Sequence, residues 1–462
     1  MRQETRQSDS RPILPRLKFT NLTTPYALLI QKTTTSAKPW KSSGSRIGSV
    51  KKRKSVLTSN VFERIVFIDL PEEKESVPAG LFTLDIELGV GSFQYGRRYV
   101  QRPNAIAIDP INLPLTGNKY ITRINGGIFG ILRDVLPDSW GKYIMAKHLG
   151  LPFGTLKDYE FIDLISTNAV GAISFGATPE KATTMEEEAI SLSDLAKVAT
   201  IIDQALDDQE LPPEILHLLR QGTSLGGAQP KCTVTIDNEE WIAKFESSKT
   251  AVKYPGIEYA TMTLAKKAGI KVPEIRLESV AGRSIYLIKR FDRERGRRLP
   301  FMSAFALSNL DLDELERGSY PEIASHMRKF VSHVQEDHHQ LFRRMVFNIF
   351  VRNEDDHLRN HGFIYHNDWR LSPAYDIVPI PARRRAQDTF HLALNIGDQG
   401  SMASAKNLLS QCERFSLSQE QAHEIIDQIE NTVQDWESEM TQAAVSKSDQ
   451  EAIRWCFEGF RR

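Results

Sequence analysis

The sequence has few cysteines and no long apolar run. Cys232, Cys412 and Cys456 are the only three among 462 residues, an odd number without the close spacing of a metal site. This count excludes a disulfide scaffold and favours a reducing compartment. No segment approaches the roughly 20 consecutive apolar residues of a membrane-spanning helix, and no signal-peptide core precedes a cleavage site. We therefore expect a soluble, cytoplasmic protein of two or three domains.

The sequence also lacks a net charge, although its charges are unevenly distributed. Lys plus Arg number 59 and Asp plus Glu number 59, and residues 1–60 hold 13 of the basic residues but only Glu4 and Asp9 among the acids. The remainder is mildly acidic, which argues against nucleic-acid binding by the body of the protein. Residues 1–58 are expected to be a disordered basic tail or an extension from a misassigned start; a targeting peptide or an arm that touches nucleic acid is the alternative.

Polar residues with the spacing of a phosphoryl-transfer site follow an apolar helical pattern. Apolar residues at helical spacing between Phe342 and Phe350 predict a buried helix. Asp355 and Asn360 come next, five residues apart. The same spacing occurs in the D-x-x-x-x-N loop, in which the Asp accepts the proton of a substrate hydroxyl and the Asn holds a magnesium ion. A polar loop with Asx turns is the structural alternative.

A second acid is expected to fold back onto this loop. The segments GFIYH and WRLS flank Asn367-Asp368 and predict a hairpin with a two-residue turn. The hairpin would return Asp376 to the end where Asn360 lies. Mg²⁺ typically takes one or two such oxygen ligands from a protein and completes its shell with phosphate and water.

A glycine-rich loop lies upstream, in the segment GTSLGGAQPK. Gly222, Gly226 and Gly227 allow backbone conformations in which several N–H groups approach a phosphate closely. The loop matches neither the Walker A motif nor the dinucleotide fingerprint, so it is weak evidence when taken alone.

The segments KCTVTI and EWIAKF predict a hairpin that turns at Asp237-Asn238. Lys244 ends its second strand, as the Lys of V-A-I-K does in kinases, and Glu258 lies on the helix expected next. A Lys–Glu pair of that kind positions the lysine on the α and β phosphates of ATP. An ordinary hairpin with a surface salt bridge is the alternative.

Other elements can be predicted from local patterns. The segments ERIVFIDL, GLFTLDIEL and YGRRYVQRPNAIAI are strand-like. Pro137 and Asp138 should begin a helix that Gly150 ends, with Trp140 in the core. The segments IRLESV and RSIYLIKRFDR predict a strand pair that leads into helical sequence. The rest of the chain should be mainly helical, with a helix over AHEIIDQIENTVQDWE capped near residues 416–418.

With these residues in kinase order, the chain resembles the HipA family of toxin–antitoxin kinases. The resemblance runs from about residue 62 to the C-terminus through VFIDLPEEKESVPAGLF, LPDSWGK, SLGGAQPK, IEYATMTLAKKAGI, RFDR, NEDDHLRNHGF and LSPAYDIVP. It implies an α+β, protein-kinase-like fold of two lobes with an extra small mixed α/β subdomain. The expected divisions are the tail (1–58), the HipA N-terminal subdomain (59–178), the kinase N-lobe with the glycine-rich loop (179–298) and the helical C-lobe with the catalytic loop (299–462).

The resemblance implies ATP and Mg²⁺ as cofactors and nine residues that contact them. These are Gly226, Gly227, Lys244, Glu258, Lys289, Phe291, His357, Asn360 and Asp376. Lys244 and Glu258 would serve the phosphates, and Lys289 to Phe291 would be the hinge that meets adenine. Lys289 stands where family members often have Glu, which matters little if only the main chain touches adenine.

The family's catalytic base falls on Asp355, and its magnesium ligands fall on Asn360 and Asp376. Asp356 adjoins Asp355, but the spacing to Asn360 favours Asp355 as the base.

Two further positions follow from the resemblance and the local pattern. His357 and His361 are four apart, but they lie in an expected loop and lack the Glu of H-E-x-x-H. A hydrogen-bonding or nucleotide-contacting role for His357 is therefore favoured over zinc. The family's regulatory serine falls on Ser224, whose autophosphorylation is expected to pull the glycine-rich loop out of the ATP site.

The leading hypothesis is an ATP-dependent serine/threonine protein kinase that arrests growth, as in persistence, and is neutralised by a HipB-like DNA-binding antitoxin. By analogy its substrate would be an aminoacyl-tRNA synthetase, and DNA would be reached only through the antitoxin. One alternative is a small-molecule phosphotransferase of the aminoglycoside-kinase kind. Another is a non-catalytic pseudokinase co-repressor, which the intact Lys244, Asp355, Asn360 and Asp376 oppose. A neighbouring gene for a helix-turn-helix protein would favour the toxin hypothesis.

Overall fold

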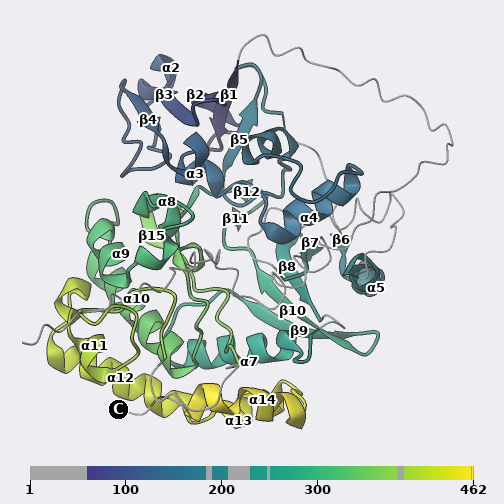
Figure 1. Ribbon diagram of the computed structural model, residues 1–462, viewed down its shortest axis with the longest axis vertical. Helices are drawn as coiled ribbons and strands as arrows, with labels where there is room; N and C mark the ends of the chain where they lie inside the picture. Colours follow the sequence, from purple (N-terminus) through teal and green to yellow (C-terminus); the bar gives the residue numbers. More distant parts are fainter. Residues whose placement is uncertain are drawn as a thin grey trace, which may run out of the picture.

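The computed structural model describes residues 60–183, 190–206, 229–246, 250–381, 390–458 and 460 (Figure 1). Within these ranges, no helix combines the length and the apolar character that crossing a bilayer requires. The three cysteines are buried and unpaired.

The first sheet is antiparallel, with the strand order β4-β3-β2-β1-β5. Its strands are β1 (Val61–Ile68), β2 (Val77–Asp85), β3 (Val90–Tyr95), β4 (Lys119–Thr122) and β5 (Ile173–Gly176). Apolar residues on its inner face, such as Val66, Phe82 and Phe93, have no exposed surface. Alternation of buried and exposed residues therefore places one face of this sheet on the core.

Two of the three strands predicted for this region are confirmed as β1 and β2. The third prediction, over YGRRYVQRPNAIAI, was wrong, because Arg97–Val100 forms the short helix α2. The chain turns after Gly96, and the hydroxyl of buried Tyr99 donates to the carbonyl of Ile106 at 2.8 Å. This contact folds the segment back on itself, so it does not run as an extended strand.

Short helices connect β4 to β5 of the first sheet, and one of them, α4, leads toward the second sheet. They are η1 (Ile124–Gly127), α3 (Gly130–Arg133), α4 (Ser139–His148) and η2 (Asp158–Leu164). As predicted, Asp138 caps α4 by accepting from the Gly141 N–H at 2.6 Å, and Gly150 takes a positive φ just beyond its end. Trp140 is fully buried, as predicted, in a cluster that includes residues of the second sheet.

The second sheet has the strand order β6-β7-β8-β10-β9. Its strands are β6 (Ile190–Ser191), β7 (Lys231–Ile236), β8 (Glu239–Phe245), β9 (Ile275–Val280) and β10 (Arg283–Lys289). β6 runs parallel to β7, and the other pairs are antiparallel. Asp237 and Asn238 both have positive φ, which is the backbone of the predicted two-residue hairpin turn.

Helices cover both faces of the second sheet. On one face, α4 and α5 (Leu195–Leu206), which follows the short turn η3 (Leu192–Asp194), share a buried cluster with Val234, Trp241 and Leu287. On the other face α7 (Tyr254–Lys267) packs against β9 and β10. Figure 1 shows α7 running beside β9 and β10. This second face also carries Lys244.

The segment after β10 forms a hairpin where helical sequence was predicted. Its strands are β11 (Arg293–Glu294) and β12 (Arg297–Arg298), and the turn between them has Arg295 and Gly296 at φ of 50° and 76°. Gly296 takes this conformation without strain, so the turn reverses the chain before a helix can begin. The expectation of helix directly after the RFDR segment was therefore wrong.

The last part of the chain is mainly helical around a small sheet, β13 (Phe301–Ser303), β14 (Gly362–Tyr365) and β15 (Trp369–Leu371). β14 and β15 form the predicted hairpin. The helices are α8 (Ala304–Ser308), η4 (Leu315–Arg317), α9 (Tyr320–Met327), α10 (Val334–Phe350), η5 (Leu358–Asn360), α11 (Ala405–Leu409), η6 (Cys412–Phe415), α12 (Gln419–Val433), α13 (Trp436–Gln442) and α14 (Lys447–Glu458).

The positions of α10 and α12 can be compared with the helices predicted for these segments. α10 is the predicted buried helix, and the acidic loop begins just after it. Ser418 caps α12 as predicted, because its hydroxyl accepts from the Gln421 N–H at 3.2 Å. The predicted single helix beyond it is broken, however, since α12 ends at Val433 and α13 begins at Trp436.

The C-terminal helices pack against α7. The Lys267 ammonium lies 2.5 Å from the buried carboxylate of Glu439 on α13. A side chain at Gly256 would come within 3.2 Å of Val445, so α7 and the segment after α13 approach closely there. Figure 1 shows α13 and α14 in yellow beneath α7.

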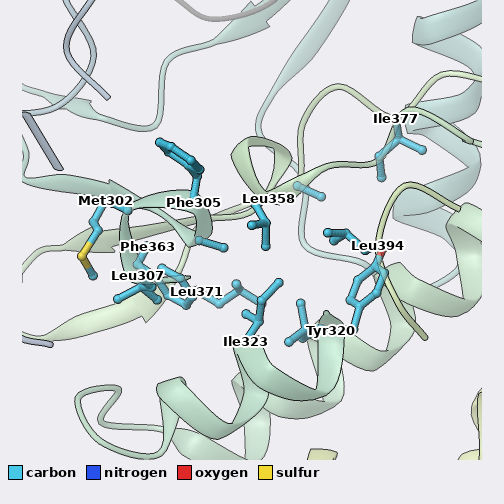
Figure 2. Packing of buried hydrophobic residues seen from close by; sticks show 14 of the residues in the cluster. Met302, Phe305, Leu307, Tyr320, Ile323, Leu358, Phe363, Leu371, Ile377 and Leu394 are labelled. Carbon is cyan, nitrogen blue, oxygen red and sulfur yellow. The ribbon is translucent and has the colours of Figure 1, made fainter. Parts of the chain in front are cut away.

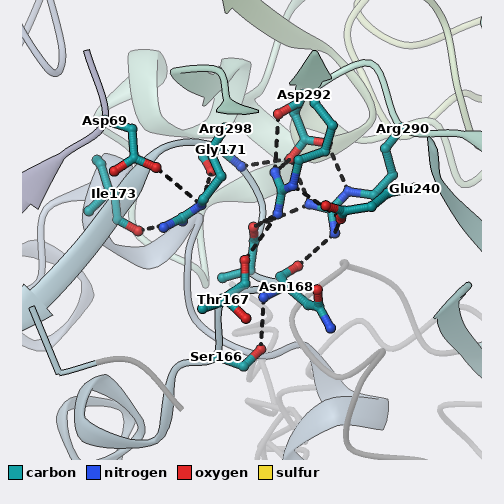
Figure 3. A network of polar contacts seen from close by, with 12 residues as sticks. Asp69, Ser166, Thr167, Asn168, Gly171, Ile173, Glu240, Arg290, Asp292 and Arg298 are labelled. Carbon is teal, nitrogen blue, oxygen red and sulfur yellow. Dashed lines mark hydrogen bonds and ion pairs between the residues drawn. The ribbon is translucent and has the colours of Figure 1, made fainter. Parts of the chain in front are cut away.

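Charged residues of the RFDR segment join the two sheets. Arg290 donates to both carboxylate oxygens of Asp292 and also to the carbonyls of Asn168 and Ala169, which lie before β5 (Figure 3). The Gly171 N–H donates to Asp292 at 2.8 Å. The Arg290 and Asp292 side chains are 1% and 6% exposed. This buried network fixes the loop before β5 against the end of β10.

Candidate active site

Lys244 is the point where three distant segments meet. Its ammonium on β8 lies 2.6 Å from Oε1 of Glu258 on α7 and 2.6 Å from Oδ1 of Asp376, which follows β15. The Lys244 side chain is 8% exposed, Glu258 is fully buried and the Asp376 side chain is 38% exposed. The lysine therefore lies at the inner end of a site that opens toward Asp376.

The charged groups of this cluster shift one another's pKa values. Burial raises the pKa of Glu258 to about 7, although Lys244 partly opposes the rise. Burial would also raise the pKa of Asp376, but the nearby ammonium groups of Lys244 and Lys231 lower it to about 2. For Lys244 burial favours the neutral form, and the two carboxylates outweigh it, so the pKa is raised. The lysine is thus a fixed positive charge at neutral pH.

Sequence reasoning missed a second lysine in this cluster, Lys231. Lys231 pairs directly with Lys244 across the β7–β8 ladder, so both side chains leave the same face of the sheet. Its ammonium lies 3.5 Å from Oδ2 of Asp138, the cap of α4, and both side chains are buried. Counting back from the Asp237-Asn238 turn gives this register, so the sequence contained the signal for Lys231. It contained none for Asp138.

The two adjacent acids of the predicted catalytic loop differ in their surroundings. Asp356 is 2% exposed, and its Oδ2 accepts from the Tyr320 hydroxyl and, at 3.0 Å, from Nε2 of His361. Asp355 is partly exposed. The environment of Asp356 is that of a structural acid, which leaves Asp355 as the candidate base.

Asn360 and His357 lie beside these acids. The Asn360 side-chain amide donates to the carbonyl of Asp355 at 3.2 Å, which leaves its oxygen, the atom that would bind a metal, outside that bond. Among the residues that the structure describes, none bonds to the buried Nδ1 of His357. His357 also contributes to the low pKa of Asp376. In the same ranges, no three His, Cys, Asp or Glu side chains gather as a metal site of their own.

Two of the three residues of the predicted hinge use their main-chain N–H groups in hydrogen bonds of the second sheet. The Lys289 N–H donates to the carbonyl of Glu274 and the Arg290 N–H to that of Glu240, each at 2.9 Å. The Lys289 side chain pairs with Glu239 at 2.5 Å, away from the ring cluster in which Phe291 lies. The Phe291 ring is 5.5 Å from that of Tyr375, next to Asp376. Of the three predicted hinge residues, Phe291 is the one whose ring lies beside the segment that carries Asp376.

A cavity of about 470 Å³ lies beside this hinge rather than at the lysine. Its lining comes from the β1–β2 loop, from Thr167 and Asn168, from Thr233, Thr235 and Glu240 of the second sheet, and from the β11–β12 hairpin with the residues up to Pro300. Lys244, Asp355 and Asp376 are not part of it. Basic and acidic side chains both line the cavity, so it has no single charge preference.

The glycine-rich loop cannot be placed beside these residues. Ser224, Gly222, Gly226 and Gly227 lie outside the described residues. The roles predicted for them stay predictions.

Two protein-family models match this chain. The HipA N-terminal domain family matches residues 75–176, and the HipA-like C-terminal domain family matches residues 223–436. The chain belongs to the HipA-like family.

A solved structure of the Shewanella oneidensis MR-1 toxin–antitoxin system, comprising HipA, HipB and its operator DNA, contains a similar chain. The similarity has a TM-score of 0.61 at 17% identity and covers 85% of this chain and 95% of that one. This result confirms the predicted α+β, kinase-like fold of HipA type.

Two curated relatives are similar over shorter stretches. A putative kinase of Haemophilus influenzae is 28% identical over 221 residues, 42% of this chain and 63% of its own length. The putative kinase Y4dM of Sinorhizobium fredii is 31% identical over 183 residues, 36% of this chain and 42% of its own length. The chain thus matches less than two thirds of either relative.

Proposed function

We propose that this HipA-like chain is an ATP-dependent serine/threonine protein kinase and the toxin of a HipA/HipB-like module. The observation that carries the proposal is the position of Lys244, held 2.6 Å from both Glu258 and Asp376. A lysine fixed by a helix glutamate is the device by which kinases hold the α and β phosphates of ATP. The names of the two curated relatives, both putative kinases, support the same activity.

The residues present fit ATP and Mg²⁺. Asn360 and Asp376 offer an amide oxygen and a carboxylate, and Mg²⁺ commonly takes one or two such ligands from a protein and the others from phosphate and water. When bound, MgATP supplies the transferable phosphoryl group and neutralises the charge that develops on it. Lys231 adds a second positive charge on the face of the sheet that carries Lys244.

The remaining roles fall on residues around this centre. Asp355 accepts the proton of the acceptor hydroxyl, because it is the exposed acid of the pair. Glu258 keeps the Lys244 ammonium in place, and the Phe291 main chain meets adenine. His357, close to Asp376, contacts the nucleotide. Autophosphorylation of Ser224 switches the kinase off by moving the glycine-rich loop away from ATP.

The proposed partner is a HipB-like DNA-binding antitoxin, through which the chain reaches DNA. Support comes from the similar Shewanella structure, which contains HipA with HipB and operator DNA. The proposed substrate is a protein of translation such as an aminoacyl-tRNA synthetase, and its phosphorylation in the cytoplasm would arrest growth.

Label transfer from ATP tests the proposal. The purified full chain is incubated with γ-labelled ATP, Mg²⁺ and a host lysate, with Lys244→Met as the inactive control. We expect one dominant labelled protein, labelled on Ser or Thr, and no label with the control. Label on an aminoglycoside instead of a protein would assign a small-molecule phosphotransferase. ATP binding without transfer to any acceptor would assign a pseudokinase co-repressor.

A further inference from the structure

A buried polar cluster lies next to the proposed catalytic residues, and the mechanism above does not use it. Its members are Asn348 on α10, Tyr320 on α9, and Asp356 and His361 in the loop after α10; all four are 2% exposed or less. The Asn348 side-chain amide donates to the Tyr320 hydroxyl at 3.0 Å, and that hydroxyl donates to Oδ2 of Asp356. Nε2 of His361 donates to the same oxygen at 3.0 Å.

Two of these residues are sequence neighbours of the proposed catalytic residues. Asp356 directly follows Asp355, and His361 directly follows Asn360. The Asp356–His361 hydrogen bond therefore closes the six-residue loop from Asp355 to Asn360, because each partner lies one residue beyond the proposed base or the proposed metal ligand. A second bond, from the Asn360 amide to the Asp355 carbonyl at 3.2 Å, closes the loop again.

The middle of the loop is also anchored. Leu358 is 2% exposed and lies among apolar residues of the C-lobe that include Ile323 and Leu394 (Figure 2). The ring of Tyr320 packs edge-on against that of His361, with 5.1 Å between centroids. The loop is thus fixed at both ends by hydrogen bonds and in the centre by packing.

We propose that Asp356, His361 and Tyr320 form a positioning clamp that sets the distance between Asp355 and Asn360 for phosphoryl transfer. The proposal rests on the proposed kinase function. None of the three residues touches a reacting atom, and the clamp acts through the backbone of its neighbours. Burial makes it effective, because a buried carboxylate must keep its donors and so holds the loop in one conformation. Displacement of a catalytic group by about 1 Å can cost about 100-fold in rate.

The chain offers a matched control. His338 on α10 is also a buried histidine with two hydrogen bonds, to the Ala324 carbonyl at 2.8 Å and to the Ser416 hydroxyl at 3.0 Å, and neither bond involves a residue of the loop. His338→Leu and His361→Leu both remove a buried histidine and should lower the melting temperature similarly. Only His361→Leu removes a donor from Asp356. His361→Gln keeps an N–H near the position of Nε2.

The full chain and its variants are compared by three measurements: the maximal rate of label transfer to the lysate protein labelled by the wild type, the affinity for a fluorescent ATP analogue, and amide hydrogen exchange over residues 355–361. For His361→Leu and Tyr320→Phe we expect a rate lower by about 10- to 100-fold, an ATP affinity within about threefold of the wild type, and faster exchange in the loop. His361→Gln should recover most of the rate, and His338→Leu should change neither the rate nor the exchange.

The clamp is refuted if His361→Leu and His338→Leu lower the rate equally, or if loop exchange is the same in both. A wild-type chain that transfers no label would refute the kinase function instead, and hydrogen exchange would still decide the clamp. Loss of ATP affinity in Tyr320→Phe equal to its loss of rate would also overturn the proposal, because a clamp on the base and the metal ligand acts on transfer rather than on nucleotide binding.

Discussion

Lys231 and Lys244 lie directly opposite each other on β7 and β8, and each is met by an acid from a distant segment. Asp138 of α4 is 3.5 Å from the first and Asp376 is 2.6 Å from the second. Two like charges on one face of a hairpin repel, and the acids beside them offset that repulsion. The site is therefore assembled from the segment that caps α4, the second sheet and the loop after β15 together.

The two roles of Asp138, capping α4 and pairing with the Lys231 ammonium, can be separated by substitution. Asp138→Asn keeps a good cap for α4 but removes the charge, whereas Asp138→Ala removes both. We expect Asp138→Asn to destabilise the fold by about 3 kcal/mol, because the buried ammonium of Lys231 loses this carboxylate, and Asp138→Ala to cost about 1 kcal/mol more. Urea unfolding measures both. Equal stability of the two variants would show that the cap contributes nothing.

Substituting Asp355 and Asp356 one at a time tests which of them is the base. Asp355→Asn should lower label transfer by about 100- to 10,000-fold and leave the melting temperature nearly unchanged, because the acid is partly exposed. Asp356→Ala should cost about 1–3 kcal/mol of stability, since it strands the buried donors of Tyr320 and His361. A folded Asp355→Asn protein with near-normal activity would contradict the assignment.

Stability should depend on pH through Glu258. Its pKa is about 7 in the folded protein against an ordinary value of 4.5, so the folded state binds the proton more tightly than the unfolded state. The stabilisation from this group is complete below about pH 4.5 and is lost as the pH rises through about 7, by up to about 3 kcal/mol. The difference in unfolding free energy between the wild type and Glu258→Gln should follow that curve. A difference that does not vary with pH would rule it out.

Neutralising Asp292 should lower the stability of the fold and at the same time loosen the loop before β5. Asp292 is buried, and although burial opposes its ionisation, Arg290 and Arg293 lower its pKa strongly. Asp292→Asn leaves two buried guanidinium groups with less compensation, and we expect a loss of about 3–5 kcal/mol. Faster hydrogen exchange at residues 167–171 should accompany it, because Gly171 donates to this carboxylate. Arg297→Gln, an exposed change in the same hairpin, is the control and should alter neither quantity.

A phosphate on Ser224 should abolish ATP binding. It adds about −1.5 to −2 charges in the glycine-rich loop and would compete with the nucleotide for Lys244. Ser224→Asp should therefore weaken binding of a fluorescent ATP analogue strongly, whereas Ser224→Ala should retain binding and lose the phosphorylation site. Mass spectrometry after prolonged incubation with MgATP locates the phosphate. Unchanged affinity in the phosphorylated protein would end the self-inactivation hypothesis but not the kinase hypothesis.

Local patterns in the sequence predicted the parts of the site that local rules govern. The turn at Asp237-Asn238 fixes the register of β7 and β8, so the place of Lys244 at the end of a strand followed from residues within about ten positions of it. The cap of α4 and the β14–β15 hairpin were likewise predictable from a few neighbouring residues.

Contacts between distant residues were not predictable in this way. Nothing near Asp356 signals that Tyr320, 36 residues earlier, occupies its carboxylate. Spacing to Asn360 selected Asp355 over Asp356 as the candidate base, and that choice stays a prediction. The RFDR segment resembled a plain hinge, yet its charged side chains bind carbonyl groups more than 120 residues away. Periodicity carries no information about such pairings.

The contact of α13 with α7 has a consequence for the order of synthesis. Glu258 lies on α7, and α7 is supported from behind by Glu439 and Val445, which are translated nearly 200 residues later. At about 5–20 residues per second, the ribosome needs many seconds to pass from the first of these segments to the second. We expect the Lys244–Glu258 pair to be held firmly only after Glu439 and Val445 have emerged from the ribosome and packed against α7.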